Sequence, residues 1–217
     1  MKIAVCSDVH QEFGPLTLEN PGDVEVLILS GDILVERDLD EWNEAQAGQG
    51  FMRYRSEMFH TFFQECAKAF PHVLYVAGNH EHYHGDFKYT LSELKSKLSR
   101  YKNLHILDKE VFNLDNVVFV GGTLWTDMNK GDPHTLYTVS RSMNDFRQVT
   151  MFNEAKSVYH RLTPERVMED HFRSRDFIRE TVERDPGRRY VVVTHHAPSR
   201  ASTKPRYHDQ HLINGAY

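Results

Sequence analysis

Four short apolar runs each end in polar residues that can bind a metal ion, and this pattern constrains the fold more than any other feature of the chain. The runs are Lys2–Cys6, Val24–Leu29, His72–Ala77 and Tyr190–Thr194. Each has the length and composition of a buried strand, and helical spacing separates several of them, which predicts an α/β architecture with sheets covered on their faces. In open α/β sheets, ligands gather beyond the carboxyl ends of the strands. We therefore expect the four polar clusters to converge in space.

The segments between these strands carry their own signals. Apolar residues at steps of three and four predict amphipathic helices from about Arg53 to Phe70, over Phe87–Tyr101, and from Thr163 to Asp185. Thr163 followed by Pro164 is typical of a helix start. Further short strands are predicted at Leu104–Leu107, Val111–Leu114 and Val117–Val120. Residues 37–50 predict a loop or a short helix, and residues 121–150 an insertion with little regular structure.

Composition and charge exclude several classes of protein. The 217 residues are 40% hydrophobic and 26% charged, and no apolar run approaches the ~20 residues of a membrane span. A disordered chain, a coiled coil and a membrane-spanning protein are thereby excluded, and one domain over residues 1–217 is expected. The net charge of −5 weakly opposes a nucleic-acid substrate, although a local site can still be positive. Cys6 and Cys66 are interpreted as reduced core residues, and no signal peptide is seen, which favours the cytoplasm.

The polar residues after the strands are of types that bind metals. Asp8 and His10 are two residues apart, so in an extended segment their side chains would face the same way and hold one cation. Asp32 follows a glycine, and its two carboxylate oxygens can bridge two metals. Asn79 offers an amide oxygen and His195 an imidazole nitrogen. Mixed nitrogen and oxygen ligands suit Mn, Fe, Zn or Ni without choosing among them.

A pair of such metals would give His80 a role in catalysis. Metals about 3.5–4 Å apart acidify a bridging water to hydroxide and stabilise in-line displacement at phosphorus. His80 lies beside Asn79 and can reach a phosphate without binding metal. It can stabilise the transition state or protonate the leaving oxygen.

The order Asp-x-His, Gly-Asp, Gly-Asn-His-Glu, His, running from Asp8 to His196, resembles the calcineurin-like metallophosphoesterase superfamily. The resemblance implies an αββα two-sheet sandwich, the metallo-dependent phosphatase fold, with a dinuclear site. It assigns Asp8, His10 and Asp32 to the first metal, Asp32, Asn79 and His195 to the second, and His80 as the catalytic histidine. The segments 122–127 and 143–147 also resemble a bacterial and phage branch of small phosphoesterases.

One departure from the family pattern concerns the last part of the sequence. The family closes its site with a Gly-His-x-His motif on a later strand, and this chain has none. His208 and His211 are three apart and do not fit that motif. We therefore expect a single metallophosphoesterase domain that is C-terminally incomplete, lacks the strands completing its second sheet, and can associate through an unpaired sheet edge.

Several assignments stay open. His195 is favoured over His196 as the ligand because it is the first residue after its strand, and His196 would then contact the phosphate or support the ligands. His82 either faces substrate or lies in a solvated loop. The predicted function is metal-dependent hydrolysis of a phosphomonoester or phosphodiester, with a nuclease as one variant. The alternative is a binding or scaffold module of the same fold with an impaired metal site.

Overall fold

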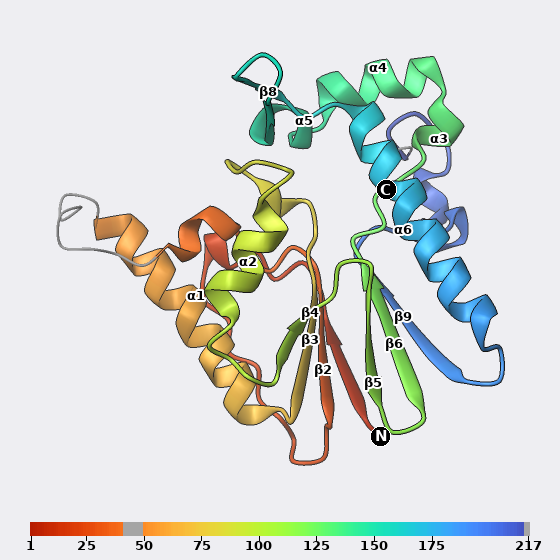
Figure 1. The fold of residues 1–217 in the computed structure, drawn as a ribbon. Helices are drawn as coiled ribbons and strands as arrows, with labels where there is room; N and C mark the ends of the chain where they lie inside the picture. The colour runs from red at the N-terminus through yellow and green to blue at the C-terminus, as the bar shows by residue number, and fades with distance from the viewer. Residues whose placement is uncertain (41–49, 215–217) are drawn as a thin grey trace. The chain divides into compact units, whose positions relative to one another are not determined.

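A computed structural model describes residues 1–40 and 50–214 of the chain. The chain divides into two compact units, of which the first spans Met1–Ile106 and the second begins at Leu107. The first is built on a parallel sheet in the order β1-β2-β3-β4 (Figure 1). Its strands are β1 (Ile3–Cys6), β2 (Val26–Ser30), β3 (His72–Val76) and β4 (Leu104–Ile106). The register pairs Cys6 with Leu29 and Leu29 with Tyr75, so the carboxyl ends of three strands are level.

Two helices form the core of this unit with the sheet. They are α1 (Gly50–Ala69) and α2 (Thr90–Leu98), close to the predicted ranges. Pro71 follows α1, as expected of a helix terminator. Side chains repeat every 2 residues along a strand and every 3.6 along a helix, so the buried cluster contains alternate residues of β2 and β3 and one apolar stripe of each helix. Its members include Leu27, Leu29, Val73, Tyr75, Phe59, Phe62, Phe63, Cys66, Leu94 and Leu98.

Short 3₁₀ helices follow the carboxyl ends of the strands of the first unit. They are η1 (Gln11–Phe13) after β1, η2 (Glu36–Leu39) after β2 and η4 (His80–His82) after β3. The segment 37–50, predicted as a loop or short helix, begins within η2, and its residues 41–49 lie outside the described residues. Each of these turns carries residues of the candidate site.

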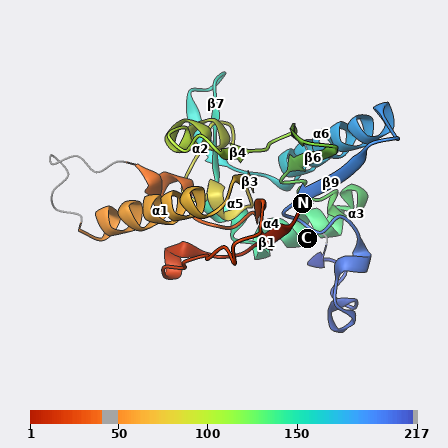
Figure 2. The ribbon, with the colours of Figure 1, turned by 90° about the horizontal axis from the view of Figure 1, so that it is seen from below.

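The second unit has its own sheet and one long helix. Antiparallel β5 (Glu110–Leu114) and β6 (Val117–Gly122) are joined by β9 (Arg189–Thr194), which runs parallel to β6. Helix α6 (Pro164–Arg184) begins where predicted, since Thr163 accepts a hydrogen bond from the backbone of Arg166. It lies along β6 and β9 in both views (Figures 1 and 2).

The prediction for residues 121–150 was wrong. After β6 the chain forms α3 (Met128–Gly131), α4 (Pro133–Ser142) and α5 (Asp145–Gln148). A hairpin follows, made of β7 (Thr150–Asn153) and β8 (Val158–Arg161). Asp132 caps α4 by accepting a hydrogen bond from the Thr135 backbone at 2.7 Å, and Pro133 occupies its first turn. The helix-start signal that locates α6 is therefore also present before α4.

The α/β class predicted from the sequence is confirmed, with a parallel sheet in one unit and a second sheet in the other. After β9, the described chain continues through η5 (Arg200–Ser202) and η6 (Pro205–Tyr207). None of the described helices combines the length and the apolar composition that crossing a bilayer would require.

Candidate metal centre

The turns after β1 and β2 are joined by backbone hydrogen bonds. The Asp8 amide donates to the Gly31 carbonyl at 3.1 Å and the His10 amide donates to the Asp32 carbonyl at 2.9 Å. Asp8, His10 and Asp32 have φ values of 53°, 49° and 54°, in the left-handed region. The expectation that Asp8 and His10 share a face because they lie in an extended segment was therefore wrong. The paired turns, rather than strand alternation, bring His10 beside Asp32.

Three side chains of the first unit converge on one point. The Oδ2 atom of Asp32 lies 3.7 Å from His10 Nε2 and 3.9 Å from His80 Nε2. The two imidazole rings meet edge to face with centroids 4.3 Å apart. All three candidate ligand atoms lie within 4.8 Å of one another. These separations exceed hydrogen-bonding distance, and the donor set of two imidazoles and a carboxylate fits a divalent cation of the kind predicted.

Glu12 holds both histidines from the other side, and the sequence interpretation missed it. Its Oε1 lies 2.7 Å from His80 Nδ1 and 3.2 Å from His10 Nδ1, and its side chain is 6% exposed. Burial raises the pKa of Glu12, but hydrogen bonds from the histidines outweigh burial and hold that pKa below its ordinary value. Burial lowers the pKa of His80, yet Glu12 and Asp32 raise it above its ordinary value. No signal in the sequence pointed to Glu12, because its contact with His80 joins segments that are 68 residues apart.

Glu81 ties the turn after β2 to the turn after β3. Its carboxylate, which is fully buried, accepts hydrogen bonds from the backbone amides of Asp32 at 3.1 Å, Ile33 at 2.8 Å and Gly78 at 2.6 Å. The hydroxyl of Tyr75 donates to it at 2.6 Å. Burial and the charge of Glu81 raise the pKa of Tyr75 well above its ordinary value, so Tyr75 remains a donor. Glu81 thus fixes the backbone that carries Asp32.

The remaining residues of the Gly-Asn-His-Glu turn have different surroundings. The backbone amide of His80 donates to Asp32 Oδ1 at 2.9 Å, and its ring stacks on Tyr83 with centroids 4.2 Å apart. Asn79 donates from Nδ2 to the Tyr83 hydroxyl at 3.4 Å. His82 is 1% exposed and stacks on Phe87 at 4.9 Å, so its ring is packed inside the first unit.

His195 and His196 belong to the second unit, directly after β9. His195 is half-buried, and its ring lies 5.0 Å from that of His196. His196 is 6% exposed and packs on Trp125, with ring centroids 4.9 Å apart. Its backbone amide donates to the Thr123 carbonyl at 3.2 Å. Of the two, His195 is the more accessible, and its preference over His196 as a metal ligand stays a prediction.

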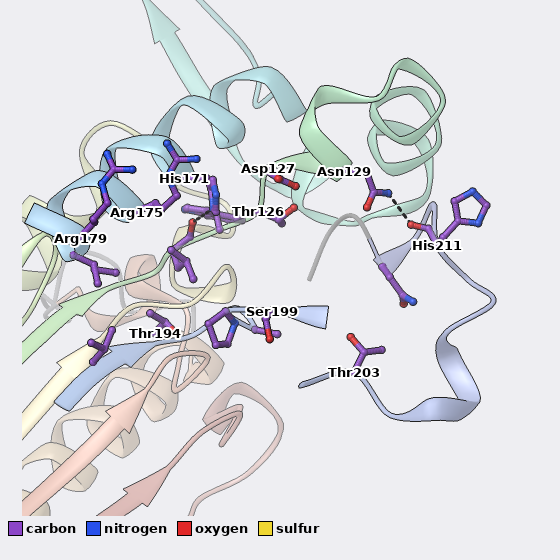
Figure 3. A pocket seen from close by; sticks show the side chains of 17 residues that line it. Thr126, Asp127, Asn129, His171, Arg175, Arg179, Thr194, Ser199, Thr203 and His211 are labelled. Carbon is purple, nitrogen blue, oxygen red and sulfur yellow. Dashed lines mark hydrogen bonds between the residues drawn. The ribbon is translucent and has the colours of Figure 1, made fainter. Parts of the chain in front are cut away.

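A cavity of about 590 Å³ lies beside these residues in the second unit (Figure 3). His171, Arg175 and Arg179 line it from α6, while Ser199 and Thr203 line it from the chain after β9. His171 Nδ1 donates a hydrogen bond to the Leu124 carbonyl at 2.9 Å. Asn129 donates to the carbonyl of His211 at 2.8 Å, which ties the C-terminal segment to the wall of the cavity.

The sequence is similar to a known protein family and to a viral protein. A family model, Metallophos or calcineurin-like phosphoesterase, matches residues 1–215. The uncharacterized protein L509 of Acanthamoeba polyphaga mimivirus is 25% identical over 185 residues, which cover 83% of this chain. The match spans 58% of that relative, less than two thirds of its length.

A solved structure shares the fold. The crystal structure of phosphopantetheinyl hydrolase (PptH) from Mycobacterium tuberculosis superposes with a TM-score of 0.62 at 15% identity. The match covers 99% of this chain and 75% of that chain. The predicted metallophosphatase fold is thus confirmed. Since the family model covers nearly the whole sequence, this chain belongs to the calcineurin-like phosphoesterase family.

Proposed function

We propose that the chain hydrolyses a phosphomonoester or phosphodiester with the help of two divalent metal ions. The observation that carries the proposal is the convergence of His10 Nε2, Asp32 Oδ2 and His80 Nε2 at the carboxyl ends of the strands. Of these groups, His10 and Asp32 suit a cation and His80 is proposed to face the phosphate beside it, and the family to which the chain belongs is a family of phosphoesterases. Bound metals would supply an acidified water and neutralise charge at the phosphate.

The ligand assignment combines this geometry with the order of motifs. Asp8, His10 and Asp32 would hold the first metal, and Asp32, Asn79 and His195 the second. Manganese is the metal we propose to test first, because mixed nitrogen and oxygen ligands accommodate it. The burial of His82 and His196 favours packing roles for both rings over direct contact with substrate.

His80 is the residue proposed to act on the substrate. Its raised pKa keeps a larger fraction of imidazolium near neutral pH, which suits a group that stabilises phosphate charge or protonates the leaving oxygen. Its ring is held by Glu12 at Nδ1 and by Tyr83 across its face, which leaves Nε2 directed toward the side of Asp32. Such restraint reduces the cost of orienting the group in the transition state.

The cavity of the second unit is proposed to bind the part of the substrate that does not react. Thr194 lines it and immediately precedes His195, so along the chain the cavity adjoins a proposed metal ligand. Its lining mixes apolar side chains such as Ile178 with Arg175 and Arg179, which suits an organic ester better than an inorganic phosphate. Cys6 and Cys66 are both free, which favours a reducing compartment such as the cytoplasm.

The test is a measurement of metal content together with activity on the same sample. The protein is loaded with manganese, dialysed, analysed for bound metal, and assayed with an aryl phosphomonoester and an aryl phosphodiester. We expect bound manganese, turnover of at least one ester, and loss of turnover with a chelator that returning manganese reverses. Metal binding without turnover of either ester would instead favour the binding-module alternative.

A further inference from the structure

The carboxylate of Glu12 contacts two imidazoles through the same oxygen atom. Oε1 is 2.7 Å from His80 Nδ1 and 3.2 Å from His10 Nδ1, and the side chain is almost entirely buried. An ionised carboxylate only accepts hydrogen bonds, and one oxygen atom this close to two ring nitrogens is placed as the acceptor for both. Each contact therefore requires the proton of the histidine to reside on Nδ1.

The opposite nitrogens face the candidate metal position. In both rings Nε2 is the atom that approaches Asp32 Oδ2, at 3.7 Å from His10 and 3.9 Å from His80. A neutral imidazole with its proton on Nδ1 presents a lone pair at Nε2, which is what a metal ligand needs. For His80, the same restraint makes Nε2 the atom that gives or receives a proton.

We infer that Glu12 is a positioning residue that sets the tautomer and orientation of His10 and His80 together. One carboxylate thus couples the proposed metal ligand to the proposed catalytic histidine. The kinetic consequence rests on the proposed hydrolase function, whereas the tautomers are a property of the polypeptide itself. Carboxylates that bond the outer nitrogen of a ligand histidine usually contribute 10–100-fold, roughly, to metal affinity or activity.

The first arm of the test reads the tautomers directly in the metal-free protein. Nitrogen–proton correlation spectra of the imidazoles are recorded at alkaline pH, where the rings are neutral, and His10→Gln and His80→Gln variants assign the signals. We expect both rings to carry the proton on Nδ1 in the native chain and to lose this preference in Glu12→Ala. Glu12→Gln retains an acceptor oxygen and should preserve the Nδ1–H form.

The second arm measures manganese affinity and turnover in the same variants. Glu12→Ala should weaken manganese binding or lower kcat by about 10–100-fold with KM unchanged, and Glu12→Gln should recover part of the loss. Glu19→Gln, an exposed carboxylate farther along the same loop, is the matched control and should behave as the native chain.

Two results would overturn the inference: protons on Nε2 in the native chain, or unchanged tautomers in Glu12→Ala. Should Glu12→Ala fail to fold, the Glu12→Gln spectra and the native spectra decide the question. If the native chain hydrolyses neither ester, the proposed function fails, while the tautomer arm still decides the role of Glu12.

Discussion

Asp32 uses its two carboxylate oxygens for different contacts. Oδ1 accepts the backbone amide of His80 at 2.9 Å, and Oδ2 faces the two imidazoles. The residue adopts φ 54° directly after Gly31 at φ 87°. A left-handed non-glycine residue costs roughly 1–2 kcal/mol, and three of them, Asp8, His10 and Asp32, occur in this small region. Such strain is concentrated where function requires a particular side-chain direction.

The role of His80 can be separated from that of a metal ligand by one substitution. His80→Ala should retain bound manganese and lose turnover by about 10²–10⁴-fold, because the imidazole is proposed to act on the phosphate. The geometry makes this a sharp test, since Nε2 of His80 lies nearly as close to Asp32 as that of His10. Metal analysis and initial rates on the same preparation decide it, and loss of metal from the variant would instead make His80 a ligand.

At the scale of elements, the sequence predicted the long helices, which have a clear apolar period, and the buried strands, which are short apolar runs. Helix α6 was located by Thr163-Pro164 and by its apolar spacing, and the strands of the first unit by short apolar runs. In the segment 121–150, α3 and α5 have four residues each, too few to show a helical period, and the ten-residue α4 was missed although a cap signal precedes it. The hairpin β7–β8 was missed because β7 is only partly buried and β8 is exposed, so no buried apolar run marks either strand. Asp132-Pro133 was the overlooked signal.

The buried carboxylate of Glu81 should contribute strongly to stability by joining the turns after β2 and β3. Glu81→Ala leaves buried donors on Asp32, Ile33 and Gly78 without their acceptor, and each costs about 1–3 kcal/mol. We expect Glu81→Ala to lower the free energy of unfolding, measured in urea, by several kcal/mol. Tyr75→Phe, the control, removes a single bond and should cost about 1 kcal/mol. Equal losses in the two variants would show that Glu81 does not organise these turns.

The contact between η2 and α2 predicts a pH dependence of stability. Glu36 is 1% exposed, and its Oε1 lies 2.5 Å from Lys97 Nζ. Burial raises the pKa of Glu36 from 4.5 to about 7, although Lys97 opposes this. Between pH 4.5 and about pH 7, the Glu36 carboxyl loses its proton in the unfolded chain but keeps it in the folded chain. The contribution of Glu36 is therefore fully present below pH 4.5, declines as pH rises toward 7, and is constant above.

The measurement compares urea unfolding of the native chain and of Glu36→Gln at about pH 5 and about pH 8. From the lower to the higher pH, the free energy of unfolding of the native chain should fall by up to about 3 kcal/mol more than that of the variant, at ~1.4 kcal/mol per pH unit. Glu57→Gln on α1, an exposed position, should follow the native chain. A variant with the same pH dependence as the native chain would assign the effect to another group.

At the scale of the whole molecule, the sequence offers candidate site residues more readily than the residues that support them. Asp8, His10, Asp32, Asn79, His80 and His195 are proposed because each follows a strand, and strand ends can be located in one dimension. Glu12 and Glu81 act through contacts between segments that are distant in sequence, such as Glu12 with His80 and Glu81 with Asp32. No spacing rule specifies such contacts, so they emerge only from the folded backbone.

Metal binding should also be visible in the stability of the whole chain, without any substrate. A ligand that binds only the folded state, and is present at about 100 times its Kd, stabilises that state by about 2.7 kcal/mol. For a chain of this size, that corresponds to a rise in Tm of about 5–10 °C on adding manganese to the metal-free protein. Asp32→Asn should abolish most of this rise, because Asp32 is proposed to contact both metals, whereas Glu57→Gln should keep it. Differential scanning calorimetry at fixed protein and metal concentrations measures the effect, and a chelator should reverse it. An equal rise in Asp32→Asn would place manganese elsewhere on the chain and refute the bridging role of Asp32, whatever the activity assay shows.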